Sequence, residues 1–122
     1  MSQDAPAGQP GCLFCRIARG EIPATALYDD ALVVAFRDIA PMAPTHVLVI
    51  PKQHVNSLAH GTPEHEALFG RLMRVATDVA RQEGITETGY RVVINTGADG
   101  GQSVPHLHLH VLGGRKLGWP PG

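Results

Sequence analysis

The alternation of histidine and aliphatic residues near the C-terminal end of the chain is the strongest constraint on its fold. Residues 106–112 have the sequence His-Leu-His-Leu-His-Val-Leu. Alternate side chains of a β-strand point to the same face, so this segment is predicted to be a strand with three imidazoles on one side. The leucines and the valine would then face the core. Because valine or threonine packs better on a strand than histidine does, the pattern indicates chemistry at this face.

Two kinds of chemistry could use three histidines in this spacing. A single metal ion is one, but the Cα atoms of His106 and His110 would lie about 13 Å apart, too far for one ion to hold all three rings. A nucleophilic histidine whose neighbours bind an anionic substrate is the other. The glycine-rich segment 97–105, which contains Ser103, favours the second, because glycines let backbone N–H groups approach phosphate oxygens. The alternative without chemistry is a polar strand face with incidental histidines after a plain turn.

Charge and composition exclude several classes of protein. The chain has 122 residues and a formal net charge of −1, with no cluster of lysine and arginine, so nucleic acid is not expected as a partner. No apolar run approaches the length of a membrane-spanning helix, so no membrane association is expected. Residues 1–11 are polar and lack the features of a signal peptide, and they are expected to form a disordered tail. The chain is therefore predicted to form a single domain over residues 12–122 and to be cytoplasmic.

Periodicity and turn residues predict the order of the elements. A short helix is expected at residues 12–19, and a long helix with Thr62 as its N-cap and Pro63 in its first turn is expected to end at Gly84. Strands are predicted at residues 24–29, 31–37, 46–50, 90–95 and 106–112. Two helices and about five mainly antiparallel strands indicate an α+β fold, with the helices on one face of the sheet.

The long helix carries an apolar stripe at helical spacing. Gly70 lies within this helix and should cost about 1 kcal/mol relative to alanine, which a close contact between the helix and the sheet would explain. The stripe is assigned to the core and to no chemistry, and it consists of Leu68, Phe69, Leu72, Met73, Val75, Ala76, Val79 and Ala80.

Cys12 and Cys15 form a Cys-x-x-Cys pair. In a cytosolic protein such a pair indicates zinc binding or redox chemistry more than a structural disulfide. Two cysteines are by themselves a weak signal for zinc, because a closed tetrahedral site needs four ligands. Two reduced thiols packed as small apolar groups are the alternative.

Several separated motifs resemble one family. Residues 106–112 are similar to the signature of the histidine triad (HIT) family of nucleotide hydrolases and transferases, and the likeness extends over nearly all of residues 12–122. Four further segments resemble the branch called histidine triad nucleotide-binding protein, or Hint: residues 36–39, 43–52, 100–106 and 113–122. The resemblance implies the HIT-like fold. It also implies a homodimer in which two five-stranded sheets join into a continuous ten-stranded sheet.

The activity that the resemblance implies is that of a purine nucleoside phosphoramidase, which hydrolyses the P–N bond between AMP and an amine. His108 would be the nucleophile that forms a nucleotidyl-histidine intermediate, and Ser103 would pass a proton to the departing amine. His46, His106 and His110 would shape the site, with His46 and His110 holding the phosphate. His110 favours the hydrolases, because the nucleotidyltransferase branch has glutamine at that place. The alternatives are a dinucleoside polyphosphate hydrolase and a non-catalytic nucleotide-binding regulatory protein.

The resemblance also implies a pocket for a purine nucleotide, AMP or GMP. Asp38 would accept hydrogen bonds from the ribose hydroxyls, and Asn95 and Gln102 would also bind the nucleotide. The alternative for Asp38 is a turn residue before Pro41, and for the apolar residues it is ordinary core packing. The apolar residues that would surround the purine are Leu13, Phe14, Ile17, Phe36, Ile39 and Leu48.

A structural zinc ion is the metal that the resemblance implies. Cys12, Cys15, His54 and His106 would hold it, and it would tie the N-terminal helix to the sheet beside the active site. Some Hint proteins lack the cysteine pair, so no cofactor is expected to be required for catalysis. A zinc-stabilised interaction module without catalysis is a further alternative, which rests on these four residues alone.

Overall fold

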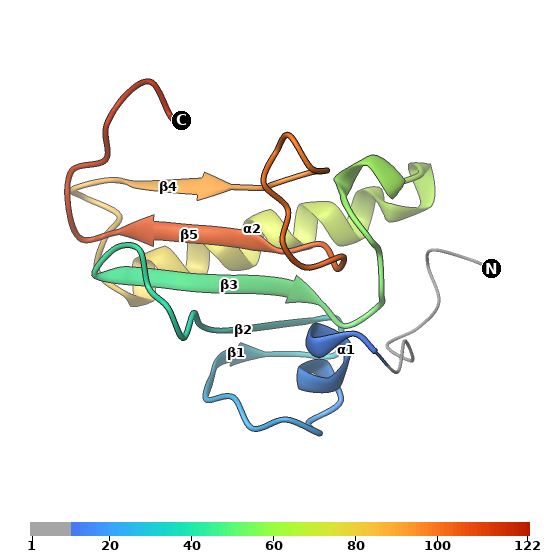
Figure 1. Ribbon diagram of the computed structural model, residues 1–122. Helices are drawn as coiled ribbons and strands as arrows, with labels where there is room; N and C mark the ends of the chain where they lie inside the picture. The colour runs from blue at the N-terminus through green and yellow to red at the C-terminus, as the bar shows by residue number, and fades with distance from the viewer. Residues whose placement is uncertain (1–10) are drawn as a thin grey trace.

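The computed structural model describes residues 11–122, so residues 1–10 of the expected tail lie outside the described residues. Five antiparallel strands form one sheet in the order β1-β2-β3-β5-β4, with α2 packed across it (Figure 1). The prediction of an α+β fold is confirmed. The elements are α1 (Leu13–Ala18), β1 (Ala26–Asp29), β2 (Val33–Arg37), β3 (Thr45–Pro51), η1 (Leu58–His60), η2 (Pro63–His65), α2 (Glu66–Gln82), β4 (Tyr90–Val93) and β5 (Leu109–Gly113).

The central strands are apolar on both faces. Val33 and Val47 belong to the core cluster beneath α2, whereas Val34 and Phe36 belong to a second cluster with α1. Alternate residues of a strand point to opposite faces, so the two helices cover opposite faces of the sheet. The prediction that both helices lie on one face is therefore wrong. The second apolar face of β2 and β3 is what α1 covers.

Burial of one helix face holds α2 against the sheet. Leu72, Val75 and Val79 are each about 1% exposed. Burying a side chain of this size contributes about 1.5–3 kcal/mol relative to leaving it in water. Met73, which the sequence assigned to the same stripe, is 47% exposed, so that assignment is wrong. The apolar stripe is narrower than the spacing alone suggested.

The ends of α2 follow local chemistry. Thr62 forms a capping box with His65 around the 3₁₀ turn η2, and α2 itself begins at Glu66, later than predicted. Gly84, with φ of 75°, ends the helix as predicted, because this left-handed conformation suits glycine. Within residues 11–122, no helix is long and apolar enough to cross a membrane.

The histidine segment is only partly a strand. β5 begins at Leu109, so the prediction of a strand is wrong for residues 106–108. The reason lies in the backbone: Leu107 N–H donates to Val55 O at 2.7 Å, and His106 N–H donates to Val104 O at 2.8 Å. These hydrogen bonds replace pairing with β4. Residues 106–108 therefore form a bent approach to the strand and contact the segment that follows β3.

Gly70 makes no close contact with the sheet, so the prediction that such a contact explains a glycine within the helix is wrong. It is exposed, and a Cβ atom added there would meet nothing within 4 Å. Gly70→Ala is expected to raise the free energy of unfolding by about 1 kcal/mol, since alanine has the higher helix propensity. Urea denaturation measures this change.

Gly84→Ala is the matched control for Gly70→Ala. A Cβ atom at Gly84 would also meet open space, but φ is 75° there, so alanine should cost about 1–2 kcal/mol. Stabilisation by both substitutions, or by neither, would contradict this account of the two glycines.

Candidate active site

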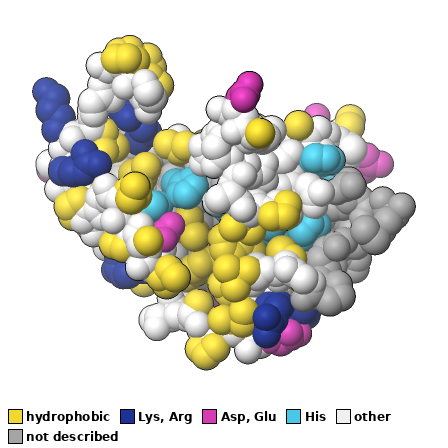
Figure 2. All heavy atoms as spheres, in the orientation of Figure 1, with side chains coloured by type: hydrophobic (Ala, Val, Ile, Leu, Met, Phe, Trp, Pro, Cys, Tyr) yellow, Lys and Arg dark blue, Asp and Glu magenta, His cyan; other side chains and the backbone are white. Residues whose placement is uncertain are grey.

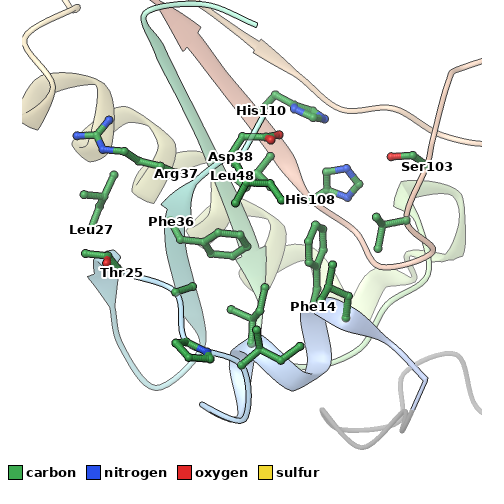
Figure 3. A pocket seen from close by; sticks show the side chains of 17 residues that line it. Phe14, Thr25, Leu27, Phe36, Arg37, Asp38, Leu48, Ser103, His108 and His110 are labelled. Atoms are coloured by element: carbon green, nitrogen blue, oxygen red, sulfur yellow. The ribbon is translucent and has the colours of Figure 1, made fainter. Parts of the chain in front are cut away.

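A cavity of about 680 Å³ lies on the α1 side of the sheet. Its volume falls within the roughly 300–1,000 Å³ of typical small-molecule sites. Hydrophobic side chains gather across the centre of this face, with histidines beside them (Figure 2). The close view shows polar side chains at one end of a mainly apolar pocket (Figure 3). Among the residues proposed from the sequence, those that line it are Leu13, Phe14, Ile17, Phe36, Asp38, Ile39, Leu48, Ser103, His108 and His110.

His108 is held in one orientation by the backbone of the preceding histidine. Its Nδ1 lies 2.7 Å from the carbonyl oxygen of His106. A carbonyl only accepts, so Nδ1 carries the proton and Nε2 of the neutral ring has a lone pair. The ring is buried, and the edge of Phe14 packs against it with the ring centroids 5.1 Å apart. His108 therefore presents an unprotonated nitrogen in the orientation that a nucleophile needs.

A hydrogen-bonded pair of histidines lies next to His108. Met42 N–H donates to Nδ1 of His46 at 3.0 Å, so the proton of the neutral His46 ring is on Nε2. Nε2 lies 2.8 Å from Nδ1 of His110 and donates to it. The remaining ring nitrogen of His110, Nε2, then carries a proton. His110 lines the cavity, so this N–H is a donor suited to a phosphate oxygen.

Burial keeps this pair neutral. The pKa of His110 is lowered to about 4, mainly by burial and then by the neighbouring His108 and His46, against the opposing effect of Asp38. Burial also lowers the pKa of His46, again opposed by Asp38. At neutral pH both rings are therefore hydrogen-bonding groups without charge.

Asp38 lies at the end of β2, where it is half-buried on the cavity wall. Its Oδ1 accepts the backbone N–H of Ala40 at 2.8 Å, which fixes the carboxylate in the turn. Its Oδ2 lies 3.5 Å from Nε2 of His46. The turn interpretation and the binding interpretation are compatible, because one oxygen orders the turn while the carboxylate faces the cavity.

Two thiols and two imidazoles form a buried cluster behind the cavity. Nδ1 of His106 lies 3.3 Å from Sγ of Cys12 and 3.5 Å from Sγ of Cys15, and Nδ1 of His54 lies 3.1 Å from Sγ of Cys15. All four donor atoms lie within 4.8 Å of one another. Soft sulfur and imidazole donors in this number match a closed tetrahedral zinc site.

The outer hydrogen bonds of this cluster also fit a metal. Nε2 of His106 donates to the Pro51 carbonyl at 2.9 Å, and Nε2 of His54 donates to Oδ1 of Asn56 at 2.5 Å. Both rings therefore turn an Nδ1 lone pair toward the thiols, which is how metal-binding histidines are usually oriented. Burial lowers the pKa of His106 to about 4, so its ring is neutral, as a ligand must be.

A second group of ligand atoms does not fit a metal. Asp38, His46 and His110 also bring three such atoms within 4.8 Å of one another. However, the nitrogen that His46 turns toward this group is the protonated Nε2, because Met42 N–H occupies Nδ1. A protonated nitrogen cannot ligate. This group is a hydrogen-bonded relay.

The structure divides the predicted site residues into two places. His108 and His110 line the cavity, whereas His106 joins the cysteine cluster. All three rings still lie on the α1 side of the sheet, because the alternating Leu107, Leu109 and Val111 pack into the core beneath α2, as predicted. Asn95 and Gln102 do not line the cavity. Asn95 Nδ2 donates to Gly100 O at 2.7 Å, and the amide of Gln102 donates to the Asn56 and Val104 carbonyls.

One wall of the cavity had no clear signal in the sequence. It comes from the irregular segment between α1 and β1 and from the start of β1. The sequence predicted a strand over residues 24–29, but β1 begins at Ala26. Arg37 also lines the cavity, while its guanidinium makes two hydrogen bonds with Glu83. The lining residues not proposed from the sequence are Ile22, Pro23, Ala24, Thr25, Leu27, Arg37 and Val104.

The fold and the cavity define a small α+β protein with a hydrogen-bonded histidine pair and an oriented His108 ring at a pocket of small-molecule size. The sequence model of the HIT domain matches residues 19–117. An uncharacterized HIT-like protein of Synechococcus elongatus is 58% identical over 110 residues, which covers 90% of this chain and 96% of that protein. The chain therefore belongs to the histidine triad family, and the family resemblance seen in its motifs is confirmed.

Two further relatives have more specific descriptions. The purine nucleoside phosphoramidase of Escherichia coli is 51% identical over 106 residues, covering 87% of this chain and 89% of that one. The crystal structure of a HIT family hydrolase from Legionella pneumophila has a TM-score of 0.89 and 50% identity, and the match covers 91% of this chain and 99% of that chain. These relatives support the prediction that the chain is an enzyme of the hydrolase class.

The lowered pKa of His110 predicts that stability falls in acid. The ring binds a proton at pH values below about 6.5 when unfolded but only below about 4 when folded. The unfolded state therefore binds more protons in this window, and the free energy of unfolding decreases as pH falls through it. The melting temperature should drop between pH 7 and pH 5, and less so for His110→Gln, which cannot titrate. Equal drops for both proteins in differential scanning calorimetry would contradict this account.

Proposed function

We propose that this protein hydrolyses adenosine 5′-phosphoramidates, or the corresponding guanosine compounds, to the nucleoside monophosphate and an amine. The observation that carries the proposal is the hydrogen bond from Nδ1 of His108 to the His106 carbonyl, which leaves Nε2 as the nucleophilic atom. The 51% identity to the Escherichia coli purine nucleoside phosphoramidase supports the choice of substrate. A nucleotide of this kind has the size and the mixture of apolar and anionic parts that the cavity suits.

The reaction proceeds in two displacements. Nε2 of His108 attacks the phosphorus, the P–N bond breaks, and the departing nitrogen takes a proton from the Ser103 hydroxyl, which recovers one from solvent. Water then attacks the phosphorus, the bond to Nε2 breaks, and the proton released from water returns to solvent. The net consumption is one water molecule for each bond cleaved. Division into two steps is the usual advantage of a covalent intermediate.

The other cavity residues bind and orient the nucleotide. The N–H on Nε2 of His110, directed by His46, donates to a phosphate oxygen, and Asp38 accepts hydrogen bonds from the ribose hydroxyls. Phe14, Phe36 and their apolar neighbours enclose the base. Because the histidine pair is neutral, it stabilises the phosphate through directed hydrogen bonds.

His108→Ala is expected to reduce kcat/KM for AMP release from adenosine 5′-phosphoramidate on the order of 10³-fold or more, since the nucleophile is lost. AMP should still bind. His60→Ala is the matched control, because His60 is exposed and does not line the cavity. Liquid chromatography of released AMP measures both.

A fully active His108→Ala variant would contradict the mechanism. Release of AMP from a dinucleoside polyphosphate but not from the phosphoramidate would replace the proposed substrate. Binding without any turnover of either substrate by the wild-type protein would favour a regulatory role.

The cysteine cluster is proposed to hold one structural zinc ion and to have no part in the chemical steps. Bound zinc would tie α1, which forms one wall of the cavity, to His54 and His106. Cys15→Ser is expected to remove the metal from the purified protein and to lower its melting temperature. Elemental analysis and calorimetry check these outcomes. Purified protein with reduced thiols and no zinc at full stability would contradict the assignment.

The proposal extends to a cytoplasmic homodimer whose two sheets join into one. β4 forms an edge of the sheet and pairs only with β5 among the described residues, so an identical strand has a place to pair. A reduced cysteine pair suits the cytoplasm. The domain is taken as residues 12–122, after a tail over residues 1–11. Sedimentation equilibrium is expected to return the mass of two chains, and the mass of one chain would contradict the dimer.

A further inference from the structure

Gln102 has a dense set of hydrogen bonds that the proposed mechanism does not use. Its Nε2 donates to Asn56 O at 2.7 Å and to Val104 O at 3.0 Å, and its Oε1 accepts Gly97 N–H at 3.1 Å. Its backbone N–H donates to Gly97 O at 3.0 Å. Both N–H groups of the side-chain amide are occupied by carbonyls. The side chain is therefore engaged with the protein backbone and does not present its donors to a nucleotide.

These hydrogen bonds close the loop between β4 and β5. The backbone and the side chain of Gln102 both bond to Gly97, so residues 97–102 form a ring-shaped turn. Gly100 packs so closely on the Thr96 backbone that a Cβ atom there would collide with it. The bond to Asn56 then fixes the turn to the segment that follows β3. The turn is closed on itself and anchored through one side chain.

The next residue along the chain is Ser103, which lines the cavity with His108 (Figure 3). Ser103 lies in the chain between Gln102 and Val104. The side-chain amide of Gln102 bonds across it to the Val104 carbonyl. The amide thus brackets Ser103 from both sides. Loss of this bracket would let the serine move, whereas His108 keeps its bond to the His106 carbonyl and His110 keeps its bond to His46.

We propose that Gln102 is a positioning residue that holds the Ser103 hydroxyl against the departing nitrogen of the substrate. The inference rests on the proposed function, because it assigns Gln102 to the protonation of the leaving group in that reaction. Its consequence is specific. The contribution of Gln102 to kcat/KM rises with the need of the leaving group for a proton. Gln102 contributes little to nucleotide binding or to attack by His108.

Two substrates separate these contributions. An alkylamine leaves the phosphorus of adenosine 5′-phosphoramidate only when its nitrogen gains a proton, as the P–N bond breaks. Fluoride leaves adenosine 5′-phosphofluoridate as an anion and needs none. In both cases Nε2 of His108 forms the new bond to phosphorus. The ratio of the two kcat/KM values therefore reports on the proton donor alone.

The experiment compares Gln102→Ala, Ser103→Ala and the double variant on both substrates. Ser103→Ala should lose roughly 10²-fold on the alkylamine substrate, the lower end for general acid catalysis, and Gln102→Ala roughly 10-fold. Each should change the rate on the phosphofluoridate by less than about threefold. The double variant should be no slower than Ser103→Ala, because both act through one hydroxyl.

Gln82→Ala is the matched control, since Gln82 is an exposed glutamine at the end of α2 that does not line the cavity and whose amide donates only to the Leu27 carbonyl, at 3.4 Å. Gln102→Glu is a second variant that retains an acceptor for Gly97 but loses both donors, and it should show the same selective loss as Gln102→Ala. Calorimetry confirms that each variant is folded before its kinetics are compared.

Equal losses on both substrates would overturn the inference and make Gln102 a general support of the fold. Additive losses in the double variant would also overturn it, as would a Gln102→Ala variant with unchanged rates. These failures are distinct from failure of the proposed function, which would appear as turnover by His108→Ala. An inactive His108→Ala variant together with any of them leaves the proposed function standing and removes only the role of Gln102.

Discussion

The site depends on one residue whose ring and carbonyl serve different partners. The ring of His106 is fully buried between the two thiols and the Pro51 carbonyl, while its own carbonyl accepts the proton of His108 Nδ1. The packing that anchors α1 therefore also sets the orientation of the His108 ring. Phe14 adds a second link, because its ring packs edge-on against both imidazoles. A metal ion in the cysteine cluster would stabilise both links together.

Hydrogen-bond direction, rather than charge, distinguishes the histidines of this region. The neighbours of His46, His54 and His106 leave each neutral ring with its proton on Nε2, and the relay from His46 gives His110 the same form. His108 has the opposite form, because a carbonyl lies at its Nδ1. Backbone groups thus leave His108, among these histidines, as the ring whose Nε2 carries the lone pair.

The sequence predicted the elements well where one physical rule acted alone. Apolar runs bounded by turn residues located β2 and β3, and helical spacing located α2. It failed where a distant partner overrode the local pattern. His106 has the spacing of a strand residue, but the backbone bond from Leu107 to Val55 bends the chain before β5. The cavity wall at Thr25 was missed because a strand was predicted over residues 24–29, whereas β1 begins only at Ala26 and Thr25 lies in the irregular segment before it. Most pocket residues were proposed through family motifs, since apolar side chains alone do not distinguish a pocket from a core.

The long separation within the cysteine cluster also bears on the order in which the molecule is assembled. Cys12 meets His106 across 94 positions of the chain, and Cys15 meets His54 across 39. Synthesis from the N-terminal side produces α1 well before His106, the partner that seats it. Because such distant contacts carry the largest loop-closure cost, the seating of α1 on the sheet is expected to be slower than the formation of the local elements.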